Sequence, residues 1–240
     1  MIDPLSGQFG KESVEADERE RRIRSLFQAV AGRYDLMNDI MSIGIHRLWK
    51  RGLARAVNAQ RGERVVDLAG GTGDVARLMA KSGACVVVCD PSPGMMAVGR
   101  GRCPASVDFV EGSAESMPFD SHSVDALTIS FGLRNVTSLH AALAEIHRVL
   151  RPGGRFLCLE FSRPWPLIAP FYDAWSYTVI PRLGAWVAGE PAAYGYLIDS
   201  IRNFPAQAEL ASAMHDAGFT DVGWRNYSGG IACLHRGTKA

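Results

Sequence analysis

The middle of the chain alternates between short apolar runs and stretches with helical spacing. The apolar runs are rich in valine, leucine and isoleucine over consecutive positions, which is typical of parallel strands buried on both faces. This pattern predicts an α/β domain whose parallel sheet is covered by helices on both sides. We expect strands at 64–71, 84–90, 106–112, 124–130 and 154–162, and helices at 73–82, 94–100 and 139–150.

The two ends of the chain and one internal segment depart from this rhythm. Apolar side chains share one helical face in residues 11–32, and residues 34–55 continue as shorter helical pieces broken at Gly44. The segment 164–196 gathers aromatic residues, prolines and glycines, and we interpret it as an inserted helical lid. A last helix and a strand pair are expected at 207–217, 220–227 and 231–236.

Length, charge and cysteine content limit the class of protein. The 240 residues fit an N-terminal helical, substrate-side segment at 1–60 and one α/β domain at 61–240, with the lid at about 164–200. The formal net charge is only +1, whereas proteins that bind nucleic acid usually have a large excess of basic residues. Five scattered cysteines without a CxxC pair indicate neither a zinc site nor a disulfide framework. We therefore expect no nucleic acid and no metal.

A glycine-rich turn follows the first predicted strand. Asp67, Gly70, Gly71 and Gly73 form it, and in open α/β sheets ligands bind beyond the carboxyl ends of the strands. The glycine spacing also fits the fingerprint of dinucleotide-binding proteins. Asp67 and the neighbouring Asp74 would repel a pyrophosphate but attract an ammonium group, which favours S-adenosylmethionine over NAD.

Further signals follow in chain order. Asp90 ends the second strand, where an acid accepts hydrogen bonds from ribose hydroxyls. Ser113 and Ala114 follow the third strand, at the point where a polar–small pair borders the adenine in many methyltransferases, and Ser130 ends the fourth. Proline and glycines at 150–154 end a helix and turn the chain. Together these signals predict a class I S-adenosylmethionine-dependent methyltransferase: a Rossmann-like, seven-stranded, mostly parallel sheet with N-terminal helices and the inserted lid.

Longer strings narrow this prediction. The stretches 34–39 with 44–50, 67–74, 130–136 and 234–237 resemble the ubiquinone/menaquinone biosynthesis C-methyltransferase family over residues 22–238. The resemblance implies methyl transfer from S-adenosylmethionine to a ring carbon of a polyprenylated quinol, either demethylmenaquinol or 2-methoxy-6-polyprenyl-1,4-benzoquinol. It implies cofactor contacts at Thr72, Asp90, Ser113, Ala114 and Ser130. The family often has asparagine where Ser113 stands, and a serine hydroxyl can both donate and accept a hydrogen bond.

Three residues are catalytic candidates for such a reaction. A quinol carbon becomes nucleophilic when its neighbouring hydroxyl loses a proton, so a base or a fixed cation would help. Arg134 would stabilise a developing phenolate, or else form an ion pair that holds its loop. Asn135 would orient a quinol oxygen or cap the following turn. His46, whose usual pKa is near neutrality, would act as the base or pack beneath a helix.

Further residues are candidates for quinol binding. We expect Tyr34, Asp35 and Asn38 at the entrance to the site; the alternative for Asp35 and Asn38 is that they cap helices. Tyr172 and Tyr177 would close over the ring, or belong to ordinary core. A polyprenyl tail needs a long apolar groove, which the aromatic segment and the N-terminal helices would provide.

The expected location follows from the absence of a signal peptide and of a long apolar stretch. We expect a cytoplasmic protein that contacts the inner face of the membrane peripherally, because its substrate is a lipid. A homo-oligomer or a quinone-biosynthesis complex is a further expectation. The alternatives are a methyltransferase for another lipid-like small molecule, an NAD-dependent oxidoreductase, and a non-catalytic quinol-binding or complex-organising protein. No Tyr-x-x-x-Lys pair supports hydride transfer.

Overall fold

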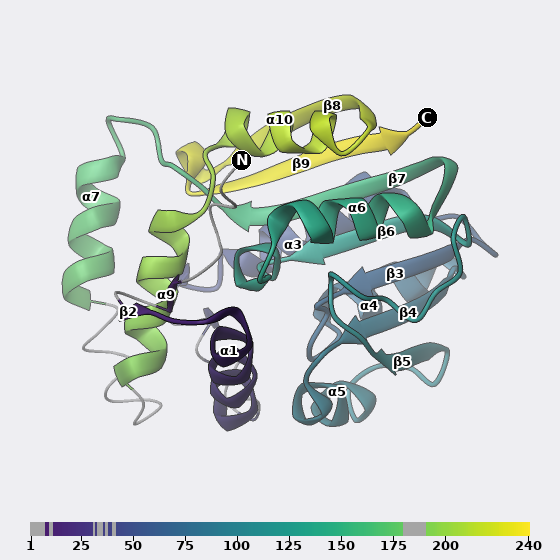
Figure 1. Ribbon diagram of the computed structural model, residues 1–240, viewed down its shortest axis with the longest axis horizontal. Coiled ribbons are helices and arrows are strands. Elements are labelled where there is room, and N and C mark those ends of the chain that lie inside the picture. Colours follow the sequence, from purple (N-terminus) through teal and green to yellow (C-terminus); the bar gives the residue numbers. More distant parts are fainter. Residues whose placement is uncertain are drawn as a thin grey trace.

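The computed structural model describes residues 8–9, 12–30, 32, 36, 38–39, 42–179 and 191–240. Seven strands form one sheet in the order β5-β4-β3-β6-β7-β9-β8 (Figure 1). The first five in this order are parallel, whereas β9 is antiparallel to β7 and to β8. The strands are β3 (Arg64–Leu68), β4 (Cys85–Asp90), β5 (Val107–Glu111), β6 (Val124–Ser130), β7 (Leu150–Phe161), β8 (Phe219–Tyr227) and β9 (Ala232–Lys239). The expected seven-stranded, mostly parallel sheet is confirmed.

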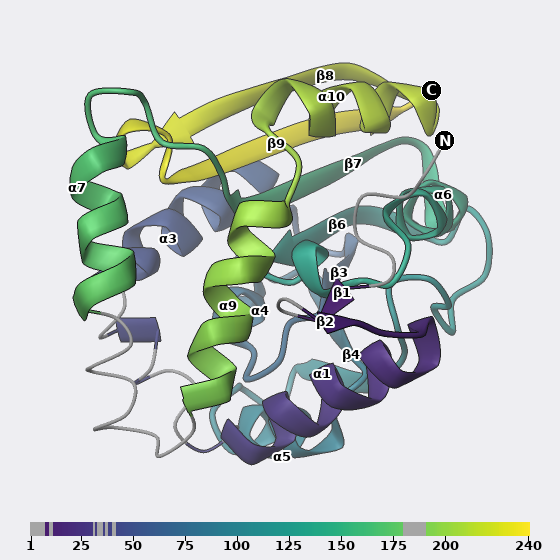
Figure 2. The ribbon, with the colours of Figure 1, turned by 60° about the vertical axis from the view of Figure 1, so that its left-hand side comes forward.

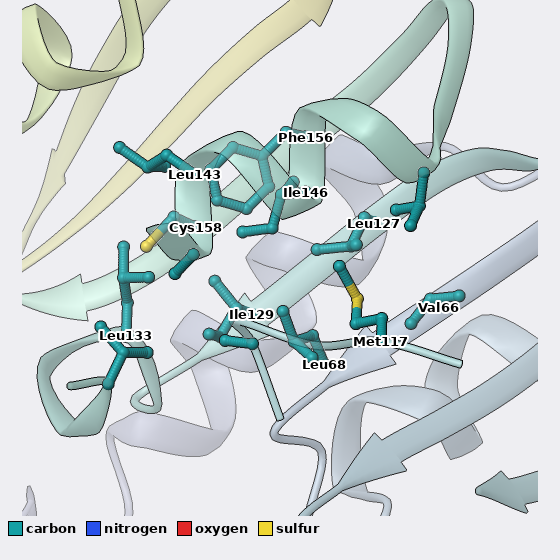
Figure 3. Close-up of a cluster of buried hydrophobic side chains, with 14 of the residues drawn as sticks. Val66, Leu68, Met117, Leu127, Ile129, Leu133, Leu143, Ile146, Phe156 and Cys158 are labelled. Atoms are coloured by element: carbon teal, nitrogen blue, oxygen red, sulfur yellow. The ribbon is translucent and has the colours of Figure 1, made fainter. Parts of the chain in front are cut away.

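Alternation along each strand sends side chains to two separate cores. Val66 and Leu68 of β3 pack with α6 (Leu139–Val149) and α10 (Gln207–Asp216) in the cluster shown in Figure 3. Val65 points to the other face and packs with α3 (His46–Val57) and α4 (Asp74–Met79). Both faces of the sheet are therefore buried, as the continuous apolar runs predicted.

The remaining helices lie near the carboxyl ends of the parallel strands. Figures 1 and 2 show α1 (Ala16–Val30) beside α5 (Pro93–Arg100), and α7 (Ala169–Ala174) and α9 (Pro191–Asn203) beyond the end of β7. A π-helical turn, Trp175–Val179, continues α7. Short 3₁₀ turns occupy Ala80–Ser82, Leu133–Asn135 and Ser228–Gly230. The aromatic segment that we interpreted as a lid contributes α7, the π-helical turn and α9 to this end of the sheet.

The N-terminus differs from the expected helix at 11–32. The short strands β1 (Gln8–Phe9) and β2 (Glu12–Ser13) pair antiparallel, and the helix begins only at Ala16. The apolar positions on which the helix was based start later, at Ile23, so they said nothing about residues 11–15. In the described ranges, no helix combines the length and the hydropathy that a membrane crossing requires.

Candidate cofactor and quinol site

A cavity opens where the carboxyl ends of β3, β4 and β6 meet, and α1 covers one side of it with Ile23 and Phe27. We call it the first cavity. Of the predicted cofactor residues, all except Gly73 line it: Asp67, Gly70, Gly71, Thr72, Asp90, Ser113, Ala114 and Ser130. Residues that are far apart in the sequence therefore meet at one end of the sheet, because parallel strands place their carboxyl ends together.

The backbone of the glycine-rich turn adopts a conformation that residues with a Cβ atom would disfavour. Gly71 and Gly73 adopt φ values of 53° and 77°, in the left-handed region that favours glycine. A Cβ atom on Gly73 would overlap the Cys103 sulfur. Gly73 is therefore needed for the turn from β3 into α4 rather than for the cavity wall.

Asp67 is almost fully buried behind this turn. Its Oδ1 accepts a hydrogen bond from Thr128 Oγ1 at 2.8 Å, and its Oδ2 accepts one from the Ala76 backbone N–H at 3.0 Å. Burial raises the pKa of Asp67 to about 7, although both hydrogen bonds favour the charged form. The carboxyl group thus ties the first turn of α4 to β6, in addition to lining the cavity.

Asp90 is the buried acid at the end of β4. Its Oδ2 accepts the Gly71 backbone N–H and its Oδ1 accepts the Ser92 backbone N–H, both at 2.8 Å. Burial raises the pKa of Asp90 to about 6. A carboxylate has about four lone-pair sites, so these two bonds leave capacity for hydroxyl donors in the cavity.

Serines occupy the other strand ends. The backbone of Ser113 pairs with that of Ser116, which closes a tight turn after β5 with Ala114 inside it. Ser130 ends β6, and its hydroxyl is buried at the cavity wall without a hydrogen-bond partner among the described residues. A buried hydroxyl in this state is unfavourable unless a ligand provides the partner.

Arg134 lies in a buried ion pair behind the first cavity and is not part of its wall. Its Nη1 lies 2.8 Å from Oε1 of Glu160, and it also donates to the carbonyl of Phe131. The arrangement matches the loop-holding alternative that the sequence left open. Asn135, the next residue, does line the cavity, and its Oδ1 accepts a hydrogen bond from the Tyr196 hydroxyl at 3.0 Å.

His46 is the first residue of α3, and its side chain is buried. Its Nε2 lies 2.9 Å from Oδ1 of Asp39, and its Nδ1 has no partner among the described residues. Burial lowers the pKa of His46 despite the nearby carboxylate. His46 lines neither this cavity nor the second one described below.

A second, largely apolar cavity lies between the N-terminal end of α3, α7 and α9. Its wall includes Tyr172 and these residues: Ser42, Ile43, Ile45, Trp49, Phe161, Ile168, Phe171, Trp175, Ser176, Ile198, Ile201, Arg202, Ser228 and Ile231. Asn38 is half-buried nearby, where its carbonyl accepts the Ser42 hydroxyl at 2.7 Å. Tyr34 and Asp35 lie outside the described residues, and the Tyr177 side chain is also outside them.

Three aromatic rings stand between the two cavities. Phe131 lines the first, whereas Trp49 and Phe161 line the second. The Phe131 ring centroid is 4.7 Å from that of Phe161 and 6.2 Å from that of Trp49. Phe131 also has a φ of 57°, an unfavourable conformation for a bulky residue that persists only where the surroundings impose it.

Several residues in these walls were missed by sequence reasoning. Lys50 lines the first cavity, and Trp49 lines the second. Both belong to the string 44–50 that carried the family resemblance, but neither was assigned a role. Their spacing could have indicated that Lys50 is buried. Lys50 follows His46 by one helical turn and lies on the same buried side of α3 as Leu53.

Among the described residues, no group of three or more histidine, cysteine or acidic side chains is arranged to hold a metal ion.

Solved structures with similar folds support the class of the domain. A possible histamine N-methyltransferase of Thermotoga maritima aligns with a TM-score of 0.66 at 20% identity, covering 90% of this chain and 99% of that one. The Haemonchus contortus phosphoethanolamine N-methyltransferase 2, in complex with S-adenosyl-L-methionine, aligns with a TM-score of 0.61 at 15% identity, covering 80% of this chain and 52% of that one. At such identities these structures show the fold alone, which is that of class I methyltransferases.

Closer relatives are found by sequence. A ubiquinone/menaquinone biosynthesis C-methyltransferase UbiE of Rubrivivax gelatinosus is 60% identical over 237 residues, covering 99% of this chain and 94% of the relative. A protein of the same name from Rhizobium meliloti is 47% identical over 242 residues, covering 96% and 94%. The family model described as the ubiE/COQ5 methyltransferase family matches residues 15–239. The chain therefore belongs to the ubiE/COQ5 methyltransferase family.

Proposed function

We propose that the chain binds S-adenosyl-L-methionine in the first cavity and transfers its methyl group to a ring carbon of a polyprenylated quinol. The substrate is demethylmenaquinol, 2-methoxy-6-polyprenyl-1,4-benzoquinol, or both, as the names of the relatives suggest. The observation that carries the proposal is the meeting of Asp90, Ser113 and Ser130 with the glycine-rich turn around one cavity.

The residues of the first cavity fit such a cofactor. Asp90 would accept hydrogen bonds from the ribose hydroxyls, and Ser113 and Ala114 would border the adenine. Gly70 and Gly71 would let the ligand approach the backbone, and the Ser130 hydroxyl would gain a hydrogen-bond partner, which it does not have among the described residues. When bound, S-adenosylmethionine supplies an electrophilic methyl group that is already activated by the sulfonium.

The second cavity fits the quinol and the start of its tail. Its wall is mostly apolar and includes the Tyr172 side chain, and the contacting rings of Trp49, Phe131 and Phe161 connect this wall with that of the first cavity. Aromatic faces suit a quinol ring, which would have to pass or displace part of this group to reach the methyl group.

The three catalytic candidates divide between the cavity wall and the residues behind it. Asn135 is exposed to the first cavity and would orient a quinol oxygen. Arg134 and His46 would act as positioning residues, because the Arg134 pair holds the loop that carries Asn135 and His46 holds the start of α3. Tyr34, Asp35, Asn38 and Tyr177 remain proposed contacts at the quinol side.

The outer surface near the second cavity supports peripheral membrane contact. Ile43, Leu48, Leu167 and Phe171 are large apolar side chains that are 70%, 60%, 83% and 77% exposed. On α3, Arg51 and Arg55 are exposed close to Leu48 and form no ion pair with a described residue. Apolar side chains flanked by cations suit an anionic lipid surface, from which a polyprenylated quinol would enter.

The test measures transfer of label from methyl-labelled S-adenosylmethionine to short-tailed demethyl benzoquinol and naphthoquinol analogues. We expect label in at least one quinol and little in the Asp90→Ala variant. Asp108→Ala, which alters an exposed acid on the neighbouring strand β5, is the matched control and should transfer label normally. Cofactor binding without label in either quinol would refute the quinol assignment and leave another lipid-like acceptor.

A further inference from the structure

The first cavity contains a buried cation that the predicted cofactor set does not include. Lys50 is only 7% exposed, and it lines the cavity from the inner side of α3. Removing an ammonium group from water is strongly unfavourable unless it is paired and hydrogen-bonded. A buried lysine therefore requires anionic or hydrogen-bonding partners that offset the loss of hydration.

One such partner is present. The Lys50 Nζ lies 3.0 Å from Oδ2 of Asp74, the first residue of α4. Asp74 is also 3.6 Å from Arg77, so its charge is shared between two cations. An ammonium group has three N–H donors, and Lys50 makes no other hydrogen bond to a described residue. The remaining donors lie at a cavity that both Lys50 and Asp74 line.

The other basic residue in the described wall of the cavity serves a different region. Arg24 of α1 is 3.3 Å from Glu111 at the end of β5, and its charge acts on Asp90. Arg24 and Glu111 therefore lie near the strand ends that we assign to the nucleoside. Lys50 and Asp74 come instead from α3 and the start of α4, so the cavity has a separate region where a cation and an anion stand side by side.

We propose that Lys50 binds the carboxylate of the methionyl group of S-adenosylmethionine, with Asp74 beside it to accept the α-ammonium group. A zwitterionic amino acid carries both charges on one carbon, and the Lys50–Asp74 pair offers the complementary charges at hydrogen-bond distance from each other. This assignment rests on the proposed function, since it names the residue that holds one end of the proposed cofactor.

The test measures equilibrium binding by calorimetry for three ligands that share one nucleoside. S-adenosylhomocysteine carries both charges, its decarboxylated analogue carries only the ammonium, and methylthioadenosine carries neither. In the wild type we expect loss of the carboxylate to weaken binding by about tenfold to a hundredfold, as for a charge-assisted hydrogen bond. In Lys50→Met that difference should shrink to about threefold or less, with methylthioadenosine bound as in the wild type.

Lys81→Met is the matched control, because it removes an exposed lysine from the turn after α4 and should leave all three affinities unchanged. A Lys50→Met variant that still discriminates by tenfold or more would overturn the assignment. A Lys50→Met variant that fails to fold leaves the wild-type comparison decisive: equal affinity for the first two ligands overturns it. If the wild type binds none of the three ligands, the proposed cofactor itself is wrong, which is a different failure.

Discussion

Replacing one member of the Arg134–Glu160 pair should destabilise the protein by more than the net contribution of the ion pair to stability, because it leaves a buried charge without a partner. Nη1 of Arg134 lies 2.8 Å from Oε1 of Glu160, and the two side chains are only 4% and 1% exposed. Glu160 also accepts the backbone N–H of Phe161 at 2.9 Å and that of Arg134 at 3.3 Å. Neither charge could be hydrated if its partner were removed without rearrangement of the fold.

The expected size follows from that burial. Breaking a buried ion pair on one side typically costs about 3–5 kcal/mol, because it leaves an uncompensated charge. For a chain of this length, each kcal/mol lowers Tm by about 2–4 °C, so Arg134→Met or Glu160→Gln should lower it by roughly 6–20 °C. In the double variant no charge is left unpaired, and its loss should be smaller than the sum of the single losses by about 2 kcal/mol.

Urea denaturation of the wild type, both single variants and the double variant measures this coupling directly. Arg151→Met is the control, since its pair with Asp125 at 2.7 Å has a half-exposed arginine and should contribute less than about 1 kcal/mol. Strictly additive losses, or single losses below about 1 kcal/mol, would refute the reasoning. Normal methyl transfer by the folded double variant would show that the Arg134 charge takes no part in the chemistry.

Three other predictions concern the turn, the buried acid and the exposed surface. Gly73→Ala should destabilise the protein clearly more than Gly153→Ala in urea denaturation, because the two φ values are 77° and 76° but only the first Cβ atom meets a neighbour, Cys103; equal losses would contradict the steric argument. Burial raises the pKa of Asp67 to about 7, above its value of about 3.9 in an unfolded chain, so the folded state holds this proton more tightly and stability from this group is lost as the pH rises from about 4 to about 7. Asp67→Asn should therefore lose less stability than the wild type between about pH 5 and about pH 8, and parallel losses would count against a buried, raised pKa. Leu167→Ser and Phe171→Ser should each weaken sedimentation with anionic vesicles by about tenfold, whereas Trp224→Ser, on β8, should not; equal effects of all three would remove the membrane surface from that end of the molecule.

Much of the fold and of the cofactor site could be predicted from the sequence because these features are local. A buried parallel strand is recognisable as a run of apolar residues, and the chain turns at the carboxyl end of that strand. Asp90 and Ser130 could therefore be assigned to one edge of the sheet without knowledge of the packing, and the cavity does bring them together. Gly71 and Gly73 of the turn could also be identified, because a left-handed φ favours glycine at these positions.

Other features depended on which faces of distant elements meet. Glu160 is 26 residues from Arg134, and nothing in either local pattern distinguishes a buried pair from a cation aimed at a substrate. The sequence pattern does not distinguish Lys50 from an exposed helical lysine. Its burial and its contact with Asp74 result from the packing of α3 against the start of α4. The sequence alone determined where the strands lie along the chain and which residues stand near their carboxyl ends, although β3 ends at Leu68 rather than at 71 and β7 begins at Leu150 rather than at 154. Only the tertiary structure decided which charges neutralise one another and which face a cavity, because the free energy of a charged side chain depends on the dielectric surroundings and partners that packing creates.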